Sequence, residues 1–360
     1  MDKLRHNNKI LIIGGYGEVG YAIAKDLAPS FPAQVIIAGR NLDQAQAAAA
    51  AIGHGVEGRG LDITAPDDNA LTDVGLVMVC LDQNDTRFAR HCLAHGIHYL
   101  DISANDHFLS QVEHLDSLAR QAGATALLSL GVAPGLTNLL AAHLCRQLDT
   151  LERLDIVLEF GLRDKHGKAA LMWMFDNLDA QYQVNIDGQK VPVQSFGDHL
   201  EYTPLERHVS LPAYRFNFSD QHVLARTLNI PSVSTWVCFE NRFATQTFAI
   251  LSRLGLGKLL RRPTPRKLAI WLMSNLQLGS NRCNITVFGD KHAPTGKLPF
   301  SVGVHGYSEA KMTALIAAEA VRQVFTTEQP PGVHHSEQVL ALAPILQVLK
   351  QHMPDITIHI

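Results

Sequence analysis

The chain has 360 residues, of which 46% are hydrophobic and 18% are charged, and its formal net charge at pH 7 is −3. This composition is typical of a globular protein with an ample core, and the length is typical of about two domains. Proteins that bind nucleic acids usually carry a strongly basic surface, and a net charge of −3 gives no sign of one, so we expect no nucleic acid partner. Five cysteines without a Cys-x-x-Cys pair give no sign of a disulfide framework or a zinc knuckle and favour a reducing cytoplasm.

A Gly-x-Gly-x-x-Gly turn follows the first apolar segment of the chain. Residues 9–13 are expected to form a strand and residues 21–27 a helix, and the turn lies between them. Gly15 permits a tight bend, Gly17 lets the backbone approach a pyrophosphate, and Gly20 allows the helix to pack closely on the sheet. The start of the helix would offer unpaired N–H groups to the phosphates. This order of elements predicts a dinucleotide-binding site.

The residue after the second strand indicates which nicotinamide cofactor binds. An NAD site usually has an Asp or Glu at this position to accept hydrogen bonds from the ribose hydroxyls. This chain has Gly39-Arg40 after the strand at residues 34–38. A guanidinium can pair with a 2′-phosphate in a bidentate way, so Arg40 favours NADP over NAD. The alternative is that Arg40 stacks on the adenine or caps the edge of the sheet.

Strands and helices alternate along the first 135 residues. We predict strands at residues 9–13, 34–38, 60–64, 76–81, 98–103 and 125–130, and helices at residues 21–27, 42–52, 84–95 and 106–121. Near-continuous apolar strands that alternate with helices are typical of a parallel sheet covered on both faces. The fold class is therefore α/β, with a doubly wound Rossmann domain at residues 1–135 whose ligands bind beyond the carboxyl ends of the strands.

A second, mixed α+β domain is expected at residues 136–305. Its clearest element is a hairpin at residues 182–193, because two strand-like segments flank Asp187-Gly188. Further strands are predicted at residues 154–160, 215–218, 232–239, 283–288 and 298–305, in a sheet that we expect to be antiparallel and whose apolar faces could support a homodimer. Residues 306–360 are expected to return to the Rossmann domain through helices at 309–325 and 337–352 and a strand at 356–360.

One segment of the second domain mixes apolar and basic residues. Within residues 248–278 the basic residues Lys258, Arg261, Arg262, Arg266 and Lys267 alternate with apolar residues that include Leu254, Leu256, Leu259, Leu260, Trp271, Leu272 and Met273. The pattern fits a pair of interfacial helices that would make a weak membrane-surface contact. The alternative is a helical excursion packed on the core, and the usual amphipathic pattern favours this second interpretation.

Five segments together resemble one known family. They are residues 15–20 (GYGEVG), 38–40 (AGR), 61–63 (LDI), 99–103 (YLDIS) and 131–138 (GVAPGLTN). They are similar to segments of the saccharopine dehydrogenase-like NAD(P)-binding oxidoreductases, which include saccharopine reductases, lysine 6-dehydrogenases and carboxynorspermidine synthases. The resemblance is most specific in residues 10–140.

The resemblance implies where the cofactor lies. It places the 2′-phosphate at Arg40, the adenine at Asp62 and Ile63, the ribose side at Cys80 and Leu81, and the nicotinamide at Asp101, Ser103 and Gly131. The full set of expected cofactor-binding residues is Gly15, Tyr16, Gly17, Glu18, Val19, Gly20, Gly39, Arg40, Asp62, Ile63, Cys80, Leu81, Ser103 and Gly131.

Two residues are candidates for the chemistry and the substrate. Asp101 is the candidate catalytic residue, because its carboxylate could hold a substrate ammonium; a strand-end Asp can also simply cap a turn. Asn138 is the candidate substrate-binding residue, and its alternative role is a local hydrogen bond at a helix start. Possible clamps for a substrate carboxylate are Arg215, Arg242 and Arg282.

The sequence gives little support for a metal or for a serine nucleophile. His91 and His95 share a helix face, but no nearby carboxylate or cysteine in the sequence completes a set of ligands, so we expect no metal. No Gly-x-Ser-x-Gly motif is present.

The function expected from these observations is that of an NADP-dependent oxidoreductase. The resemblance implies hydride transfer to or from an imine or amine of a small, amino-acid-derived substrate. Two alternatives stay open: a reductase of C=C or C=O bonds in a lipid-like substrate at a membrane surface, and a non-catalytic sensor that binds NADP.

Overall fold

The computed structural model describes residues 8–66, 68–148, 151–164, 168–204, 209–275, 279–293 and 296–360. The chain forms two compact units, each discontinuous in sequence. The first unit comprises Met1–Leu136 and Lys311–Val348, and the second comprises Thr137–Ala310 and Leu349–Ile360. Each unit is built on its own seven-stranded sheet.

The first unit contains a parallel sheet with the strand order β15-β6-β5-β4-β1-β2-β3. Its strands are β1 (Lys9–Ile13), β2 (Val35–Gly39), β3 (Glu57–Gly60), β4 (Val74–Val79), β5 (His98–Asp101), β6 (Thr125–Leu128) and β15 (Gly332–His335). The order reverses between β1 and β4, which is where a doubly wound sheet opens a crevice for its ligand. The predicted Rossmann architecture is confirmed.

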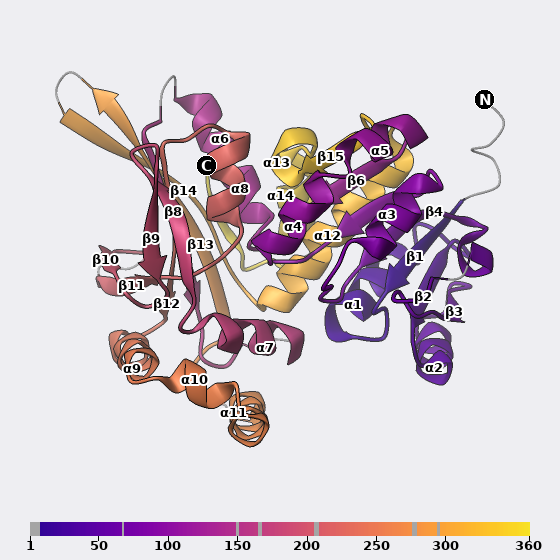
Figure 1. Ribbon diagram of the computed structural model, residues 1–360, viewed down its shortest axis with the longest axis horizontal. Coiled ribbons are helices and arrows are strands. Elements are labelled where there is room, and N and C mark those ends of the chain that lie inside the picture. The colour runs from indigo at the N-terminus through magenta and orange to yellow at the C-terminus, as the bar shows by residue number, and fades with distance from the viewer. Residues whose placement is uncertain are drawn as a thin grey trace. The chain divides into compact units, whose positions relative to one another are not determined.

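Helices cover both faces of this sheet (Figure 1). The helices of this unit are α1 (Glu18–Leu27), α2 (Leu42–Ile52), α3 (Arg87–Ala94), α4 (Asp106–Glu113), α5 (Asp116–Ala122), α13 (Ser336–Val339), and most of α12 (Glu309–Thr326) and of α14 (Leu342–His352). All residues of β2 are buried, and so are all residues of β1 after Lys9. A strand whose successive side chains point to opposite faces can be buried throughout only if both faces are covered.

Several predicted elements of the first unit differ from the observed ones by a few residues, and two of them differ in a way that has a clear structural reason. The third strand ends at Gly60, because the carboxylate of Asp62 accepts hydrogen bonds from the amide and hydroxyl of Thr64 and turns the chain. The helix predicted at residues 106–121 is two helices. Asp116 begins the second of them and accepts a hydrogen bond from the amide of Val333 in β15 at 2.9 Å. That partner lies 217 residues away, so local periodicity could not reveal the break.

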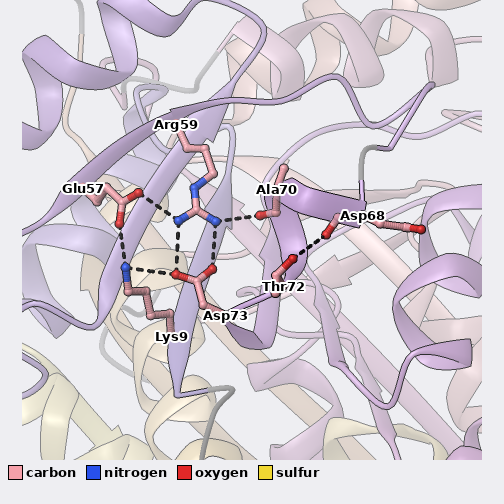
Figure 2. A network of polar contacts seen from close by, with 7 residues as sticks. All are labelled: Lys9, Glu57, Arg59, Asp68, Ala70, Thr72 and Asp73. Carbon is pink, nitrogen blue, oxygen red and sulfur yellow. Dashed lines mark hydrogen bonds and ion pairs between the residues drawn. The ribbon is translucent and has the colours of Figure 1, made fainter.

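A ring of ion pairs closes the amino ends of three strands (Figure 2). The ammonium of Lys9 at the start of β1 lies 2.7 Å from Glu57 and 3.0 Å from Asp73. The guanidinium of Arg59 lies 2.8 Å from Glu57 and 3.0 Å from Asp73, and it also donates to the carbonyl of Ala70. Beside the ring, a 3-10 turn (Asp68–Leu71) precedes β4. The ring fastens the short edge strand β3 at the end of the sheet opposite the carboxyl ends.

The second unit contains a mixed sheet with the order β10-β11-β12-β7-β13-β14-β16. Its strands are β7 (Arg153–Phe160), β10 (His199–Tyr202), β11 (Leu211–Arg215), β12 (Ser232–Phe239), β13 (Arg282–Ala293), β14 (Gly296–Tyr307) and β16 (Thr357–His359). All neighbours are antiparallel except β12 and β7, which run parallel, so the expectation of an antiparallel sheet needs this correction. The predicted hairpin is present as β8 (Gln181–Ile186) and β9 (Gln189–Gln194).

Helices of the second unit are α6 (Leu136–Gln147), α7 (Lys168–Asn177), α8 (Asp220–Thr227), α9 (Arg242–Arg253), α10 (Leu256–Leu260) and α11 (Pro263–Asn275). A buried cluster on one face of the sheet consists of Val157, Tyr202, Leu211, Ala213, Trp236 and Cys238. None of the described helices combines the length and the apolar character that a membrane span requires.

Three expectations for the second half of the chain need correction. Residues 311–348 return to the first unit as expected, where β15 pairs with β6, but Leu349–Ile360 belong to the second unit, where β16 pairs with β14. The predicted terminal helix is divided into α13 and α14, with Leu340 in extended conformation after the first. The segment at residues 248–278 is helical in its described part, to residue 275, but its large apolar side chains include many that are exposed, so it is not packed on the core throughout.

Candidate cofactor-binding and active site

The glycine-rich turn combines two glycines that the fold requires with one that it does not. A Cβ at Gly15 would lie 1.7 Å from Ile37, and a Cβ at Gly20 would lie 2.4 Å from the carbonyl oxygen of Gly14. A Cβ at Gly17 would meet only that same carbonyl, at 3.1 Å. Gly17 precedes α1 in extended conformation, which any residue can adopt. The missing side chain therefore leaves the backbone open beside the amino end of α1, as a pyrophosphate requires.

A surface hollow of about 480 Å³ lies at the end of β2, lined by Tyr16, Arg40, Asn41, Leu42 and Asp43. Tyr16 lies over Gly39, since a Cβ there would be 2.4 Å from the phenol ring. The side chain of Asn41 caps α2 by accepting from the amide of Gln44 at 3.1 Å. The hollow thus combines a guanidinium, an aromatic ring and a helix N-terminus, which suits an adenosine 2′-phosphate. Asp43 is the unfavourable member, because its carboxylate would repel that phosphate.

Asp62 and Ile63 follow β3, near the same hollow. Hydrogen bonds from Thr64 and the nearby Arg40 guanidinium lower the pKa of the exposed Asp62 carboxylate. Because the Arg40 guanidinium also lowers the pKa of Asp62, these two residues, both of which the sequence assigned to the adenosine end of the cofactor, lie near each other. The strand that carries Asp62 is shorter than predicted, but its position beyond a carboxyl end is as expected.

Cys80 and Leu81 follow β4 and adjoin the glycine-rich turn. The amide of Cys80 donates to the carbonyl of Ile13 at 3.0 Å, and a Cβ at Gly14 would lie 2.9 Å from Leu81. Burial of the thiol and the nearby Asp101 carboxylate raise the pKa of Cys80 well above its ordinary value. A raised pKa favours the protonated thiol, which is poorly suited to act as a nucleophile.

Asp101 lies at the end of β5 in a fully buried polar cluster. Its Oδ2 accepts hydrogen bonds from the phenol of Tyr99 at 2.6 Å and from Nε2 of Gln83 at 2.7 Å. Its Oδ1 accepts from the amide of Ser103 at 2.5 Å. Burial raises the pKa of Asp101 to about 7, although these three donors favour the ionised form. A carboxyl group with this pKa can both give and accept a proton near neutral pH.

Gln83 and Tyr99 belong to this cluster, but sequence reasoning did not identify them as site residues. Tyr99 lies two residues before Asp101 on the same strand face, so the period of a strand could have revealed it. Gln83 lies in the loop after β4 and carried no such signal. Its Oε1 is buried and has no hydrogen-bond partner among the described residues. An open buried acceptor of this kind fits a ligand N–H group.

Ser103 and Gly131 form tight turns after their strands. The hydroxyl of Ser103 accepts from the amide of Asn105, which caps α4. Gly131 donates to the carbonyl of Pro134 at 2.8 Å, and its own carbonyl accepts from Leu136 at 2.9 Å. These turns follow the carboxyl ends of β5 and β6, and Asp101 lies at the carboxyl end of β5.

The candidates for substrate binding lie in the second unit. Asn138 is fully buried in the first turn of α6, and its carboxamide accepts from Thr137 at 3.4 Å. Arg215 is buried, donates to Asp198 and Ser234, and stacks on Trp236. Those contacts are structural and leave Arg215 poorly suited to clamp a carboxylate.

The structure adds a carboxylate to the histidine pair that the sequence singled out. Possible ligand atoms of Asp68, His91 and His95 lie within 4.8 Å of one another. Nε2 of His91 is 3.0 Å from Asp68, and Nδ1 of His95 is 2.8 Å from the carbonyl of His91. The expectation that no carboxylate lies near these histidines is wrong. Sequence analysis missed Asp68 because it is distant from His91 and His95 along the chain. The contacts present are a close approach of His91 to the exposed Asp68 and a contact of the His95 ring with a helix carbonyl.

Parts of the chain and the chain as a whole are similar to known proteins. Residues 10–127 match the family model of the saccharopine dehydrogenase NADP binding domain. An apo, histidine-tagged saccharopine dehydrogenase (L-Glu forming) from Saccharomyces cerevisiae is similar over 98% of this chain and 100% of its own, with a TM-score of 0.60 and 15% identity. A DAP dehydrogenase from C. glutamicum in complex with DAP gives a TM-score of 0.46 at 14% identity, over 96% of this chain and 99% of its own.

The first unit supplies the features that this type of domain needs. Gly17 leaves room for the pyrophosphate, and the hollow at Arg40 suits the adenosine end. The yeast enzyme shares the fold along the whole chain. Residues 10–127 thus match a saccharopine dehydrogenase NADP binding domain, and the whole chain shares the fold of the yeast saccharopine dehydrogenase.

Proposed function

We propose that the protein is an NADP-dependent oxidoreductase that transfers a hydride to or from the imine or amine carbon of a small, amino-acid-derived substrate. The buried Asp101 cluster at the carboxyl end of β5 is the observation that supports chemistry at this site. A functional group with a pKa of about 7 next to an unpaired buried acceptor is typical of a catalytic site rather than of a simple turn.

The bound cofactor would supply or accept the hydride, and the residues of the chain would manage the proton. In the reductive direction the imine carbon gains the hydride with its two electrons, and the nitrogen gains a proton. We assign that proton to Asp101, which loses it and becomes a carboxylate held by Tyr99 and Gln83. Oε1 of Gln83 would accept a hydrogen bond from the substrate N–H. Oxidation of the amine would reverse each transfer.

Arg40 would select NADP by pairing with its 2′-phosphate. The test is a titration of the purified protein with NADPH and with NADH, followed by nicotinamide fluorescence. For Arg40→Asp we expect NADPH to bind about 10- to 100-fold more weakly, because a charge-assisted hydrogen bond contributes about 1.5–3 kcal/mol, while NADH binding changes little. Equal loss of both cofactors would show that Arg40 is structural.

Asp43→Asn provides the matched control for Arg40. Both residues line the same hollow, but Asp43 carries the opposite charge. Removal of its carboxylate should strengthen NADPH binding a few-fold and leave NADH unchanged. If neither variant distinguishes the two cofactors, the hollow does not bind the 2′-phosphate.

A substrate screen completes the test. NADPH oxidation should be followed with keto acids in the presence of amines, and NADP reduction with amino acids. Deuterium transferred from C4 of labelled NADPH to the product carbon would establish the hydride step. Tight cofactor binding without turnover of any amine, imine or carbonyl compound would favour the NADP sensor instead.

A second candidate keeps the cofactor and changes the substrate. The exposed apolar side chains of α9 and α11 favour a lipid-like compound whose C=C or C=O bond is reduced. Turnover of enoyl or keto lipids, with none of imines, would support this candidate. The homodimer, the cytoplasmic location and the substrate-binding role of Asn138 remain predictions; light scattering and an Asn138→Ala variant would test the first and the last.

A further inference from the structure

Three consecutive helices of the second unit expose large apolar side chains. On α9 and just after it, Phe243 is 81% exposed, Ile250 57% and Leu254 78%. On α11, Leu268 is 56% exposed and Trp271 60%. Exposure of single apolar residues is common, but so many on one short stretch of chain is typical of an interaction surface.

The exposed side chains follow the helical period. On α9 they recur at i, i+7 and i+11, which places Phe243, Ile250 and Leu254 along one face. On α11, Leu268, Trp271 and Leu272 recur at i, i+3 and i+4. The short helix α10 joins the two and exposes Leu259. We call the exposed side of α9, α10 and α11 the helical face; in Figure 1 these helices follow one another in orange, beside the second sheet.

The charge of the helical face has one sign. From Arg242 to Asn275 the sequence contains seven Lys or Arg residues and no Asp or Glu. Carboxylates from other elements pair with some of the cations: Arg242 lies 2.7 Å from Glu201, and Arg261 lies 2.6 Å from Asp179. These pairs attach the helices to the rest of the unit.

Three further cations point to solvent between the exposed apolar residues. Lys258, Arg262 and Lys267 are exposed, and no ion pair is recorded for them within the part of the chain that the structure describes. Lys258 adjoins Leu259, and Lys267 adjoins Leu268. A row of apolar side chains interleaved with Lys and Arg suits a surface that is apolar at depth and negatively charged on top.

We propose that the helical face docks the protein, in the plane of the interface, onto membranes that contain anionic phospholipids. The apolar side chains of α9 and α11 would enter the acyl boundary, with the indole of Trp271 at the level of the headgroups. Lys258, Arg262 and Lys267 would meet lipid phosphates and carboxylates, each contributing about 1 kcal/mol. The proposal does not depend on which substrate the enzyme reduces.

A second copy of the chain fits this face less well. In a twofold dimer the same patch meets itself, so the cations of one copy would approach those of the other. The segment from 242 to 275 has no carboxylate to neutralise them. Like charges that approach at an interface oppose association, whereas an anionic bilayer complements all of them.

Vesicle flotation tests the proposal. The full chain should float with vesicles of phosphatidylcholine and phosphatidylserine, less with phosphatidylcholine alone, and less at high salt because salt screens exposed charges. The variant K258Q/R262Q/K267Q should bind the anionic vesicles about 100-fold more weakly, which corresponds to three contributions of about 1 kcal/mol. The matched control K25Q/R90Q/K350Q removes three exposed cations elsewhere and should bind as the wild type does.

A pair of single variants tests the apolar part. Leu268→Ser should weaken vesicle binding about tenfold, since a leucine that enters the acyl boundary contributes about 1.5 kcal/mol. Ile360→Ser removes an apolar side chain of similar exposure, 60% against 56%, and should have no effect. Quenching of the Trp271 indole by brominated lipid, lost in Trp271→Phe, would show that the helical face itself inserts.

Three outcomes would overturn the proposal: no flotation of the wild type, equal loss in both charge triples, or a dimer in light scattering that Leu268→Ser converts to a monomer. The last would identify the face as an interface between copies. Titration with NADPH separates this inference from the proposed function, because every helical-face variant should bind the cofactor with unchanged affinity.

Discussion

At the scale of single residues, the protonation of Asp101 connects the fold to the proposed chemistry. Its carboxyl group is ionised in the unfolded chain above pH 3.8, its ordinary pKa, but in the folded protein burial raises that pKa to about 7. The folded state therefore holds one more proton than the unfolded state between these two values. Stability from this group is fully present below about pH 4 and decreases as the pH rises towards 7.

Asp101→Asn should reveal both roles of this carboxyl group. The variant cannot ionise, so its melting temperature should rise relative to that of the wild type as the pH increases from 4 to 8. The step near pH 7 in the pH profile of kcat/KM should disappear, and kcat should fall by about 10²- to 10⁴-fold, as expected for loss of a general acid. Parallel melting curves at all pH values would show that Asp101 titrates outside this range.

Asp101 also shows how far sequence reasoning could go. Its place at a strand end and its resemblance to a family motif made it a candidate, but burial and the contacts with Gln83 arise only in the folded sheet. The sequence separation of 18 residues between Gln83 and Asp101 is bridged by the parallel pairing of β4 and β5, which no local pattern encodes.

At the scale of elements, the turn between β1 and α1 separates folding from binding. Gly20→Ala would place a Cβ 2.4 Å from the backbone of Gly14, which is rigid, so we expect a loss of about 1–3 kcal/mol in the free energy of unfolding. Gly17→Ala should cost little stability, because its Cβ meets one carbonyl at 3.1 Å, but should weaken NADPH binding strongly. Denaturant titration and cofactor titration of the two variants give the comparison. Equal stabilities would contradict the distinction.

The ion-pair ring at the opposite end of the sheet acts on stability alone. The Arg59 guanidinium and the other partners of Asp73 lower its pKa to about 2, so the ring contributes stability above pH 4 that is lost as the pH falls to 2. The Asp73 side chain is 36% exposed, and solvent screening limits the effect.

Asp73→Asn should lower the free energy of unfolding by about 1 kcal/mol at pH 7, a difference that should vanish near pH 2. Asp85→Asn serves as control, because Asp85 pairs with the exposed Arg87 and its loss should change the free energy of unfolding much less than the loss of Asp73 does. Cofactor affinity should not change in either variant. A penalty for Asp73→Asn that persists at pH 2 would mean that the charge is not its cause.

The elements were predictable where the pattern is local. The strand of β12 and the hairpin of β8 and β9 follow from alternation and from Asp187-Gly188, and both are present. The parallel pairing of β12 with β7 and the break before Asp116 depend on partners far away in sequence, so periodicity could not reveal them. The exposure of α11 was missed because an amphipathic pattern does not show whether its apolar side meets a core.

At the scale of the whole molecule, the cofactor-binding unit extends beyond the segment that matches the family model. Residues 311–348 belong to it, and β15 pairs with β6. His335 at the end of β15 holds both Ser129 at 2.8 Å and Glu113 at 2.9 Å. Cofactor binding to residues near the start of the sequence should therefore also stabilise β15.

Saturating NADPH should slow amide hydrogen exchange in β15 and α12 as well as in residues 10–127. Ligand at 100 times its Kd stabilises the folded state by about 2.7 kcal/mol, and exchange through opening of the whole unit slows accordingly. The strands β10 and β11 of the second unit should show little change. Protection confined to residues 10–127 would show that the first unit does not open as one body.

Because the first unit consists of two segments far apart in the sequence, the ribosome synthesises its second segment only after most of the second unit. Strand β6 emerges early but keeps an open edge until β15 has been synthesised, some two hundred residues later along the chain. By then every strand of the second sheet except β16 has been synthesised. An unpaired parallel edge invites association with other nascent chains. Chaperone demand during synthesis should therefore fall on the nucleotide-binding half, although that half is translated first.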